Sequence, residues 1–295
     1  MSAEQKSRIA ANTGDRLGES PVWDAAGSAL YWVDFYGPTV HRLHTGTERL
    51  KSWTIPGAAT IGALVLASGG RLILALDAGL KLFDPLHGTL SDFADPNDGR
   101  PGVAYNDAKV DRWGRCWVGT FDVAEAEARG ILYGIDVDGR ISVGDSGFIV
   151  CNGPAFSTDG RTLYFSDSVG RRLIAYTCEP GSMILRARRV FARFSEEDGI
   201  PDGLTVDHEG NVWCALYGAG RIACFSPDGR RLRHVSLPRS SVTSCCFGGD
   251  DLSTLFVTSG RNADENAGGG TVFALDVGAR GIAEGVFDCG GSSNG

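Results

Sequence analysis

The sequence has few of the features that mark membrane or nucleic-acid-binding proteins. No window of the 295 residues approaches the roughly 18 consecutive apolar residues of a membrane span, and the first 17 residues lack the apolar core of a signal peptide. Lysine and arginine number 28 against 36 aspartates and glutamates, so the formal net charge of −8 argues against a surface for nucleic acid or anionic lipid. We therefore expect a soluble, cytoplasmic protein that binds neither nucleic acid nor membrane.

Several common site motifs are also missing. The five histidines do not recur at a regular spacing, and neither His-x-x-x-His nor Cys-x-x-Cys occurs, so the sequence has no zinc motif of that kind. We expect the histidines to lie at the surface. No phosphate-binding glycine loop or dinucleotide fingerprint occurs, which argues against a nucleotide cofactor. The eight cysteines follow no paired spacing, and we interpret them as small buried apolar residues rather than disulfides.

Helical patterns are nearly absent, and only residues 123–130 predict a short surface helix. Short β-branched and aromatic segments dominate instead, separated by turns that contain glycine, of which the chain has 42. Tight turns between strands require positive φ angles, which glycine adopts readily. The composition therefore predicts an all-β protein. The polar segment 262–270 is expected to be a loop and the tail 290–295 to be disordered.

One unit recurs about six times, each copy a polar residue, an apolar strand, a turn and a second apolar strand. The copies start at Glu19, Thr60, Asn106, Asn152, Asp202 and Thr243. Their spacing of roughly 40 to 50 residues is the period of a propeller blade. With the segments that follow, each copy supplies four antiparallel strands, so we predict a single six-bladed β-propeller over residues 1–295. A strand from about the first 15 residues could complete the last blade and cover its exposed edge.

The leading polar residue of every copy would converge on one end of the central channel. Four of them, Glu19, Asn106, Asn152 and Asp202, offer carboxylate or amide oxygens. Such oxygens suit a hard or borderline divalent cation, so the pattern predicts a metal site on the axis.

Other interpretations of single polar residues remain open. Asn152-Gly153 and Asp202-Gly203 are also common turn dipeptides. Asp34 and Asp167 follow the second strand of their units, and we expect them to lie away from the convergent end and to bond blade turns.

Five motifs, in order, resemble the gluconolactonase and regucalcin family, also called senescence marker protein. They are LGESPVWD from Leu17, YNDAKVDRWGRCWVGT, CNGPAFSTDGRTLYFSDS, PDGLTVDHEGNVWCAL and TSCCFGGDDLSTLFVTS, and the resemblance runs from about residue 15 to residue 260. It implies a six-bladed propeller that binds one divalent metal on its axis and opens lactones. The identity of the metal, among Ca, Zn, Mn, Mg and Fe, stays open because oxygen ligands accept several.

The resemblance also implies roles for individual residues. Glu19, Asn152 and Asp202 match the family's metal ligands, Asp202 matches its general base, and Asn106 matches a residue that faces substrate. Ala104 stands where many sugar lactonases of the family carry arginine, and Tyr105 follows it. We expect Asn106, Tyr105 and Ala104 to contact substrate, with weaker selection for highly hydroxylated lactones.

Three functions remain open on the sequence alone. The first is a metal-dependent lactonase whose partner is a small-molecule lactone, acting as a monomer or weak homo-oligomer. The second is a phosphotriesterase-like hydrolase on the same metal, similar to diisopropylfluorophosphatase-like propellers. The third is a non-catalytic metal-binding or interaction propeller.

Overall fold

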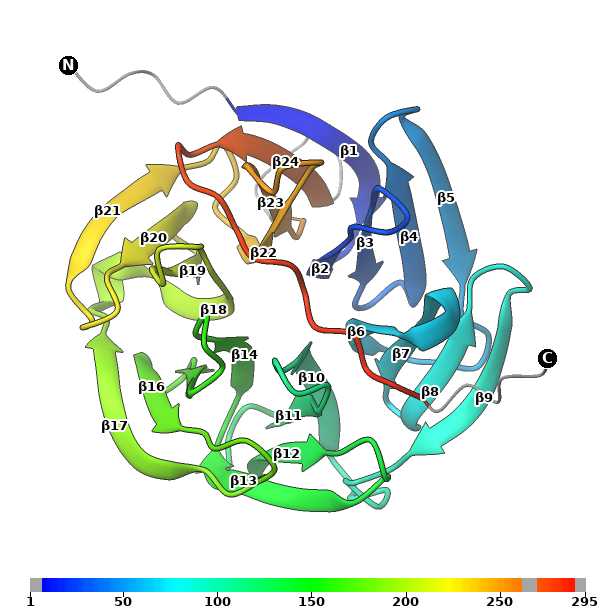
Figure 1. The fold of residues 1–295 in the computed structure, drawn as a ribbon, viewed down its shortest axis with the longest axis horizontal. Helices are drawn as coiled ribbons and strands as arrows, with labels where there is room; N and C mark the ends of the chain where they lie inside the picture. The colour runs from blue at the N-terminus through cyan, green and yellow to red at the C-terminus, as the bar shows by residue number, and fades with distance from the viewer. Residues whose placement is uncertain (1–6, 262–269, 290–295) are drawn as a thin grey trace.

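Six four-stranded antiparallel sheets surround a central axis like the blades of a propeller (Figure 1). The computed structural model describes residues 7–261 and 270–289, so the predicted tail 290–295 and the predicted loop 262–270 lie outside the described residues, except for Gly270, which begins a strand. The order of the strands confirms the predicted six-bladed propeller with four strands per blade.

The first three blades follow one another along the chain, each running from the axis outward. Their strands are β2 (Gly18–Asp24), β3 (Ala29–Asp34), β4 (Thr39–His44) and β5 (Arg49–Thr54); β6 (Ile61–Ala67), β7 (Arg71–Leu76), β8 (Gly79–Asp84) and β9 (Thr89–Ala94); and β10 (Val103–Val110), β11 (Cys116–Asp122), β12 (Gly130–Ile135) and β13 (Ile141–Phe148).

The last three blades repeat this order, except that the sixth takes its outermost strand from the N-terminus. Their strands are β14 (Cys151–Phe156), β15 (Thr162–Asp167), β16 (Arg172–Thr177) and β17 (Arg186–Arg193); β18 (Ile200–Val206), β19 (Val212–Tyr217), β20 (Arg221–Phe225) and β21 (Arg231–Ser236); and β22 (Val242–Gly248), β23 (Thr254–Ser259), β24 (Gly270–Asp276) and β1 (Ser7–Asp15).

The N-terminal strand closes the ring, as predicted. β1 pairs antiparallel with β24, with Ser7 opposite Leu275 and Asn12 opposite Thr271. This pairing covers the edge of β24 and ties the N-terminal segment to the last blade, of which β1 is the outermost strand.

Apolar packing between neighbouring blades holds the sheets in place. The innermost and second strands are almost wholly buried, whereas outer strands such as β5 and β9 are mostly exposed. Trp32, Trp117 and Trp213 are fully buried in second strands, and each indole Nε1 donates to an aspartate at 2.9 or 3.0 Å. A buried indole N–H needs such a partner.

Two local expectations are wrong. Residues 123–130 form turns rather than a helix, because the Asp122 carboxylate accepts from the backbone N–H groups of Ala126 and Glu127 and so holds an irregular loop. His41 is buried, not exposed: its ring stacks on Trp32 and its Nε2 lies 3.1 Å from the Asp15 carboxylate. Within the described ranges, the helical elements are two 3₁₀ turns, Ser68–Gly70 and Glu196–Asp198, and no helix has the length and hydropathy to cross a bilayer.

The cysteines are free, as expected. Seven are buried and Cys289 is partly exposed. Burial raises the pKa of the Cys116 and Cys245 thiols to about 12, so these thiols stay protonated and unreactive at neutral pH.

The C-terminal segment, residues 277–289, crosses one end of the central channel (Figure 1). Its backbone bonds residues from several blades: Gly281 N–H donates to Leu252 O, His208 N–H to Arg280 O, and Ser68 N–H to Phe287 O. From its middle, Glu284 reaches Lys109 of β10 at 3.2 Å, and both side chains are largely buried. The segment thereby leaves the opposite end of the channel as the open one.

Removing the charge of Glu284 should therefore destabilise the protein. Glu284→Gln leaves the buried Lys109 ammonium without its closest carboxylate, and the loss of one partner of a buried pair costs about 3–5 kcal/mol. The control Glu179→Gln removes an exposed carboxylate 3.9 Å from Arg186, and such pairs contribute about 0–1 kcal/mol. Urea unfolding monitored by tryptophan fluorescence measures both; equal midpoints for the two variants would contradict the role given to Glu284.

Candidate functional site

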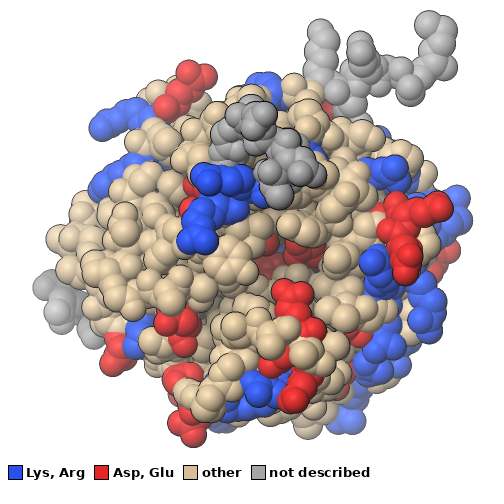
Figure 2. All heavy atoms as spheres, turned by 180° about the vertical axis from the view of Figure 1, so that it is seen from behind, with Lys and Arg blue, Asp and Glu red and all other residues tan. Residues whose placement is uncertain are grey.

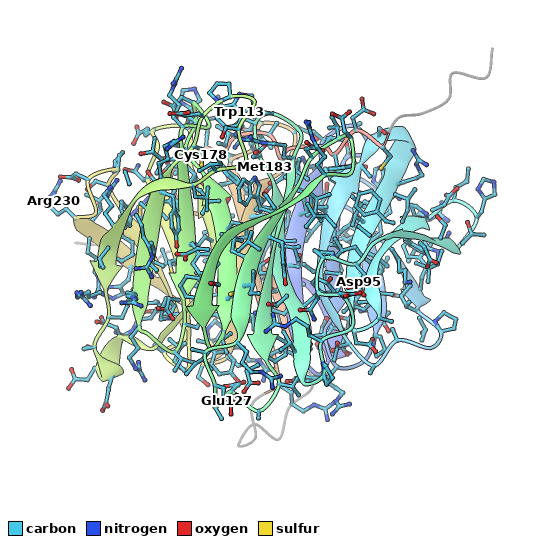
Figure 3. The ribbon with its side chains drawn as sticks, turned by 90° about the horizontal axis from the view of Figure 1, so that it is seen from below. Asp95, Trp113, Glu127, Cys178, Met183 and Arg230 are labelled. Carbon is cyan, nitrogen blue, oxygen red and sulfur yellow. The ribbon has the colours of Figure 1, made fainter. Side chains whose placement is uncertain are left out.

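A cavity of about 360 Å³ occupies the open end of the channel. Figure 2 shows this face of the ring, with acidic side chains at the bottom of a central hollow. In the side view of Figure 3, Glu127 lies at this end of the ring and Trp113 at the end that the C-terminal segment crosses. The cavity is lined by residues from five blades or their connections: Arg16, Leu17, Glu19, Phe35, Tyr36, Asn106, Phe121, Glu125, Val150, Asn152, Ser168, Val169, Ile200, Asp202, Tyr217, Thr243 and Arg261.

Five of the six leading polar residues line this one cavity. They are Glu19, Asn106, Asn152, Asp202 and Thr243. Thr60 does not line it; it precedes β6, and its backbone N–H donates to Asp77 at 3.3 Å. The convergence expected from the repeat is thus present in five blades out of six.

Each innermost strand carries an irregularity beside its polar residue. The pairing with the second strand shifts register between Glu19 and Val22 in β2, between Asn152 and Ala155 in β14, and between Pro201 and Leu204 in β18. The innermost strands of the other blades shift at the corresponding place. Because a bulge turns side chains away from strict alternation, these shifts let an innermost strand direct a polar side chain at the axis.

Glycines permit the inner strands to approach one another around the axis. A Cβ on Gly203 would lie 2.0 Å from Ser244 Oγ, and one on Gly153, which has a φ of +62°, would lie 2.8 Å from the Leu204 side chain. The dipeptides Asn152-Gly153 and Asp202-Gly203 therefore lie within innermost strands, not in turns.

Hydrogen bonds fix the two amide side chains. Asn106 Nδ2 donates to Asn152 Oδ1 at 2.6 Å and to Cys151 O at 2.8 Å, and Asn152 Nδ2 donates to Ser168 Oγ at 3.1 Å. Both N–H groups of Asn106 are engaged, so its Oδ1 can act as an acceptor or ligand, and Asn152 Oδ1 keeps one lone pair beyond the bond that it accepts.

The two carboxylates of the cavity floor are buried. Asp202 is 7% exposed and Glu19 is 9% exposed. Burial, followed by repulsion from Asp202 and Asp107, raises the pKa of Glu19 well above its usual value, and burial with repulsion from Asp107 does the same to the pKa of Asp202. Asp202 Oδ1 has no hydrogen-bond partner within residues 7–261 and 270–289. A buried carboxylate oxygen without a partner is costly unless a cation or proton meets it.

These features fit a divalent cation held by Glu19, Asn152 and Asp202. The set supplies two carboxylates and one amide oxygen, which are ligands for a hard or borderline ion. In the part of the chain that the structure describes, no three His, Cys, Asp or Glu side chains form a metal-binding cluster, so a three-residue site here needs a ligand of another type, such as the amide oxygen of Asn152.

Asp107 is a third buried acid that the sequence analysis missed. It follows Asn106 in β10 and lines a small cavity deeper in the channel, about 10 Å³ in volume, together with Lys109 and Glu284. Burial raises the pKa of Asp107 to about 6, while the positive charge of Lys109 opposes the shift. Although burial alone would lower the pKa of Lys109, Glu284 and Asp107 raise it overall. No repeated signal marks Asp107, because the equivalent position is Ile61, Gly153 or Gly203 in three other copies.

Asp107 should make the metal-free protein less stable as pH rises. The pKa of its carboxyl is about 6 in the folded state, against roughly 3.9 for an aspartate in the unfolded chain, so the folded protein holds this proton more tightly. The free energy of unfolding therefore falls as pH rises from about 4 to above 6. In chelator-treated protein, Asp107→Asn should be more stable than wild type by up to about 3 kcal/mol at pH 7.5, at about 1.4 kcal/mol per pKa unit, and this gain should vanish near pH 4. The exposed turn acid variant Asp228→Asn is the control. Denaturant unfolding across pH measures both, and a gain in Asp107→Asn that does not vary with pH would refute the prediction.

Ala104 and Tyr105 do not line the cavity. Ala104 packs beneath it, against Phe35 and Phe121, which do line it. Tyr105 points the other way into the core between blades, where its hydroxyl donates to Asp95 at 2.7 Å and accepts from Asn97 N–H at 2.8 Å. The expected packing of substrate on the Tyr105 ring is therefore wrong, because neighbouring residues of a strand face opposite sides.

Asp34 and Asp167 lie at the end of the blade where the polar residues converge, not away from it. Asp34 pairs with Gly18, the neighbour of Glu19, because the second strand runs antiparallel to the first. Their predicted role is nevertheless confirmed: Asp34 accepts from the N–H groups of Arg16 and Leu17, and Asp167 from Gly170 N–H.

The chain is similar in sequence and in fold to proteins of one known family. The profile described as the SMP-30/Gluconolactonase/LRE-like region matches residues 17–261. A 6-deoxy-6-sulfogluconolactonase of Pseudomonas putida is 36% identical over 92% of this chain and 94% of its own, and a pentonolactonase of Haloferax volcanii is 32% identical over 92% and 95%. The crystal structure of a calcium-binding protein, regucalcin, from Agrobacterium tumefaciens str. C58 superposes with a TM-score of 0.90 at 27% identity, covering 96% of this chain and 97% of that one.

Proposed function

The chain belongs to the SMP-30/gluconolactonase/LRE-like family, and we propose that it is a divalent-metal-dependent hydrolase that opens a sugar-acid lactone or a related cyclic ester to the hydroxy acid. The observation that carries this proposal is the partnerless, buried Asp202 Oδ1 in a cavity that it shares with Glu19 and Asn152. The lactonase names of two relatives support the same reaction.

Glu19, Asn152 and Asp202 would hold the cation. When bound, such an ion withdraws electrons from the lactone carbonyl and stabilises the negative charge that develops on its oxygen, an effect worth several kcal/mol. It would also offset the repulsion from neighbouring carboxylates that, together with the larger effect of burial, raises the pKa values of Glu19 and Asp202.

The remaining chemistry belongs to the side chains. The Asp202 carboxylate accepts a proton from the attacking water as the new C–O bond forms, and that proton passes to the ring oxygen as the old C–O bond breaks. A cation beside Asp202 favours its ionised form, so its catalytic contribution comes from position more than from basicity. Asn106 holds Asn152 in place and offers its own Oδ1 to a substrate hydroxyl.

Aromatic and aliphatic side chains form one wall of the cavity. Leu17, Phe35, Phe121 and Val150 lie here, above Ala104. This wall accepts the apolar face of a lactone and limits water around the reacting bond. The wall lacks the arginine that many sugar lactonases carry at the position of Ala104. We therefore propose that the enzyme selects only weakly for heavily hydroxylated lactone rings.

The same wall favours a phosphotriesterase as the second candidate, since organophosphate esters carry apolar substituents. A non-catalytic metal-binding propeller is the third. The experiment is a panel of sugar lactones, alkyl lactones and phosphotriesters, assayed by proton release on chelator-treated protein with Ca²⁺, Zn²⁺, Mn²⁺, Mg²⁺ or Fe²⁺ added. We expect lactone hydrolysis with at least one metal. Hydrolysis of phosphotriesters alone would favour the second candidate, and no hydrolysis in protein that binds metal would favour the third.

The eight free cysteines are consistent with the reducing cytoplasm that we propose as its location.

A further inference from the structure

Two arginines lie together on one side of the cavity. Arg16 is in the connection from β1 to β2, and Arg261 is two residues beyond β23; both are exposed and both line the cavity. The backbone joins them, since Arg261 N–H donates to Arg16 O at 3.1 Å and Leu17 pairs with Gly260. Basic side chains are visible on the rim of the hollow in Figure 2.

The Arg16 guanidinium is held at the rim. Its Nη1 donates to Tyr36 O at 3.1 Å, and its carbon lies 5.6 Å from the centre of the Tyr36 ring, which also lines the cavity. One carbonyl bond and one ring contact leave most of the five N–H donors of the group available. Holding a cation in this way lowers the entropy lost when it binds an anion.

In the part of the chain that the structure describes, neither guanidinium group forms an ion pair. Within residues 7–261 and 270–289, Arg16 and Arg261 have no carboxylate partner within salt-bridge distance. By contrast, Arg129 at the same end of the ring pairs with Asp122 at 3.1 Å. The acid of the cavity mouth, Glu125, belongs to the third blade, whereas the arginines lie where the sixth blade meets the first.

Arg16 and Arg261 lie where they could contact a substrate bound at the base of the cavity. A cation held by Glu19, Asn152 and Asp202 would receive the lactone carbonyl, and a substrate bound there would extend toward the cavity rim. An anionic substituent would meet the acid of Glu125 on one side and two guanidinium groups on the other. Only the second contact is favourable, because an arginine fork forms charge-assisted bonds to oxyanions.

We propose that Arg16 and Arg261 form a subsite for an oxyanion group, a carboxylate, sulfonate or phosphate, carried by the substrate at a distance from its lactone carbonyl. The inference rests on the proposed lactonase function for its reaction. It assigns to the cavity a cationic group that Ala104 cannot supply, from the junction of the sixth and first blades. The enzyme should therefore prefer acidic lactones to neutral ones of the same ring.

The test compares glucono-δ-lactone with its 6-phosphate, its 6-sulfonate analogue and glucarolactone, which carries a carboxylate. Wild type should turn over at least one acidic lactone with a kcat/KM about tenfold above the neutral lactone, an advantage carried by KM and reduced by added salt. The arm with the greatest advantage identifies the oxyanion. Arg16→Gln/Arg261→Gln should lose the advantage while glucono-δ-lactone hydrolysis stays near wild type. The control Arg230→Gln, at the opposite end of the ring in Figure 3, should keep it.

Equal kcat/KM for neutral and acidic lactones in wild type, or an advantage that survives in the double variant, would overturn the subsite. A binding arm keeps this question separate from catalysis: calorimetry compares gluconate, 6-phosphogluconate, the sulfonate and glucarate on metal-loaded protein. Tighter binding of an acidic sugar acid by wild type alone supports the subsite even if no lactone is hydrolysed, and in that case the proposed function fails. Equal binding of all the sugar acids overturns the subsite whatever the activity.

Discussion

Replacing Asp202 by asparagine should lower kcat by about 10² or more, the usual scale of a lost general base, even with metal in excess. Asparagine keeps an oxygen that can serve as a ligand, but it cannot accept the proton that the Asp202 carboxylate takes from water. Steady-state proton release at saturating lactone and metal measures the change.

A second cavity-lining acid serves as the control for Asp202. Glu125→Gln also removes a carboxylate from the cavity, but at the mouth, and should leave kcat near that of wild type. Full recovery of Asp202→Asn by added metal would mean that Asp202 only holds the cation, and the base would then have to be sought among other residues.

Replacing Glu19 by alanine should remove nearly all bound metal, and activity with it. Glu19 is one of only two carboxylates in the proposed ligand set, and the blade cores do not depend on it, so the circular dichroism spectrum should match that of wild type. Metal content after dialysis, measured by mass spectrometry of the elements, tests this.

The control for Glu19 comes from the second blade. Thr60→Val changes the leading residue of a repeat copy that does not reach the cavity, and its metal content should remain stoichiometric. Stoichiometric metal in Glu19→Ala would contradict the assignment of Glu19 as a ligand.

The repeat predicted much of this structure because propeller blades carry their own local signals. Turn glycines, alternating strands and a polar residue at a fixed offset were enough to predict six blades, their closure by the N-terminal strand, and the convergence of Glu19, Asn152 and Asp202. Each of these features depends on contacts within one blade or between adjacent blades.

Other features depend on details that no local pattern specifies. The register shift beside each polar residue changes which way the following side chains point, and Asp107 enters the channel for that reason. Tyr105 looked like a substrate contact by its place next to Asn106, but it faces the blade core and bonds Asp95. The expectation that His41 lies at the surface was wrong because its burial depends on Asp15, which belongs to the strand that closes the ring. No pattern near His41 indicates that contact.

The long-range contacts of the C-terminal segment were also unpredictable from sequence. Glu284 meets Lys109 across 175 positions of the chain, and nothing near either residue indicates the other. The same holds for Arg16 and Arg261, which come together only because the sixth blade closes against the first.

Anomalous diffraction from crystals of the protein loaded with Mn²⁺ or Zn²⁺ would locate the bound cation. We propose that Glu19, Asn152 and Asp202 together hold one divalent cation at the open end of the channel. We predict a single strong anomalous peak in this cavity, about 2.0–2.2 Å from an oxygen of each of the three side chains if the ion is zinc. A peak elsewhere, or none in this cavity at saturating metal, would contradict the account.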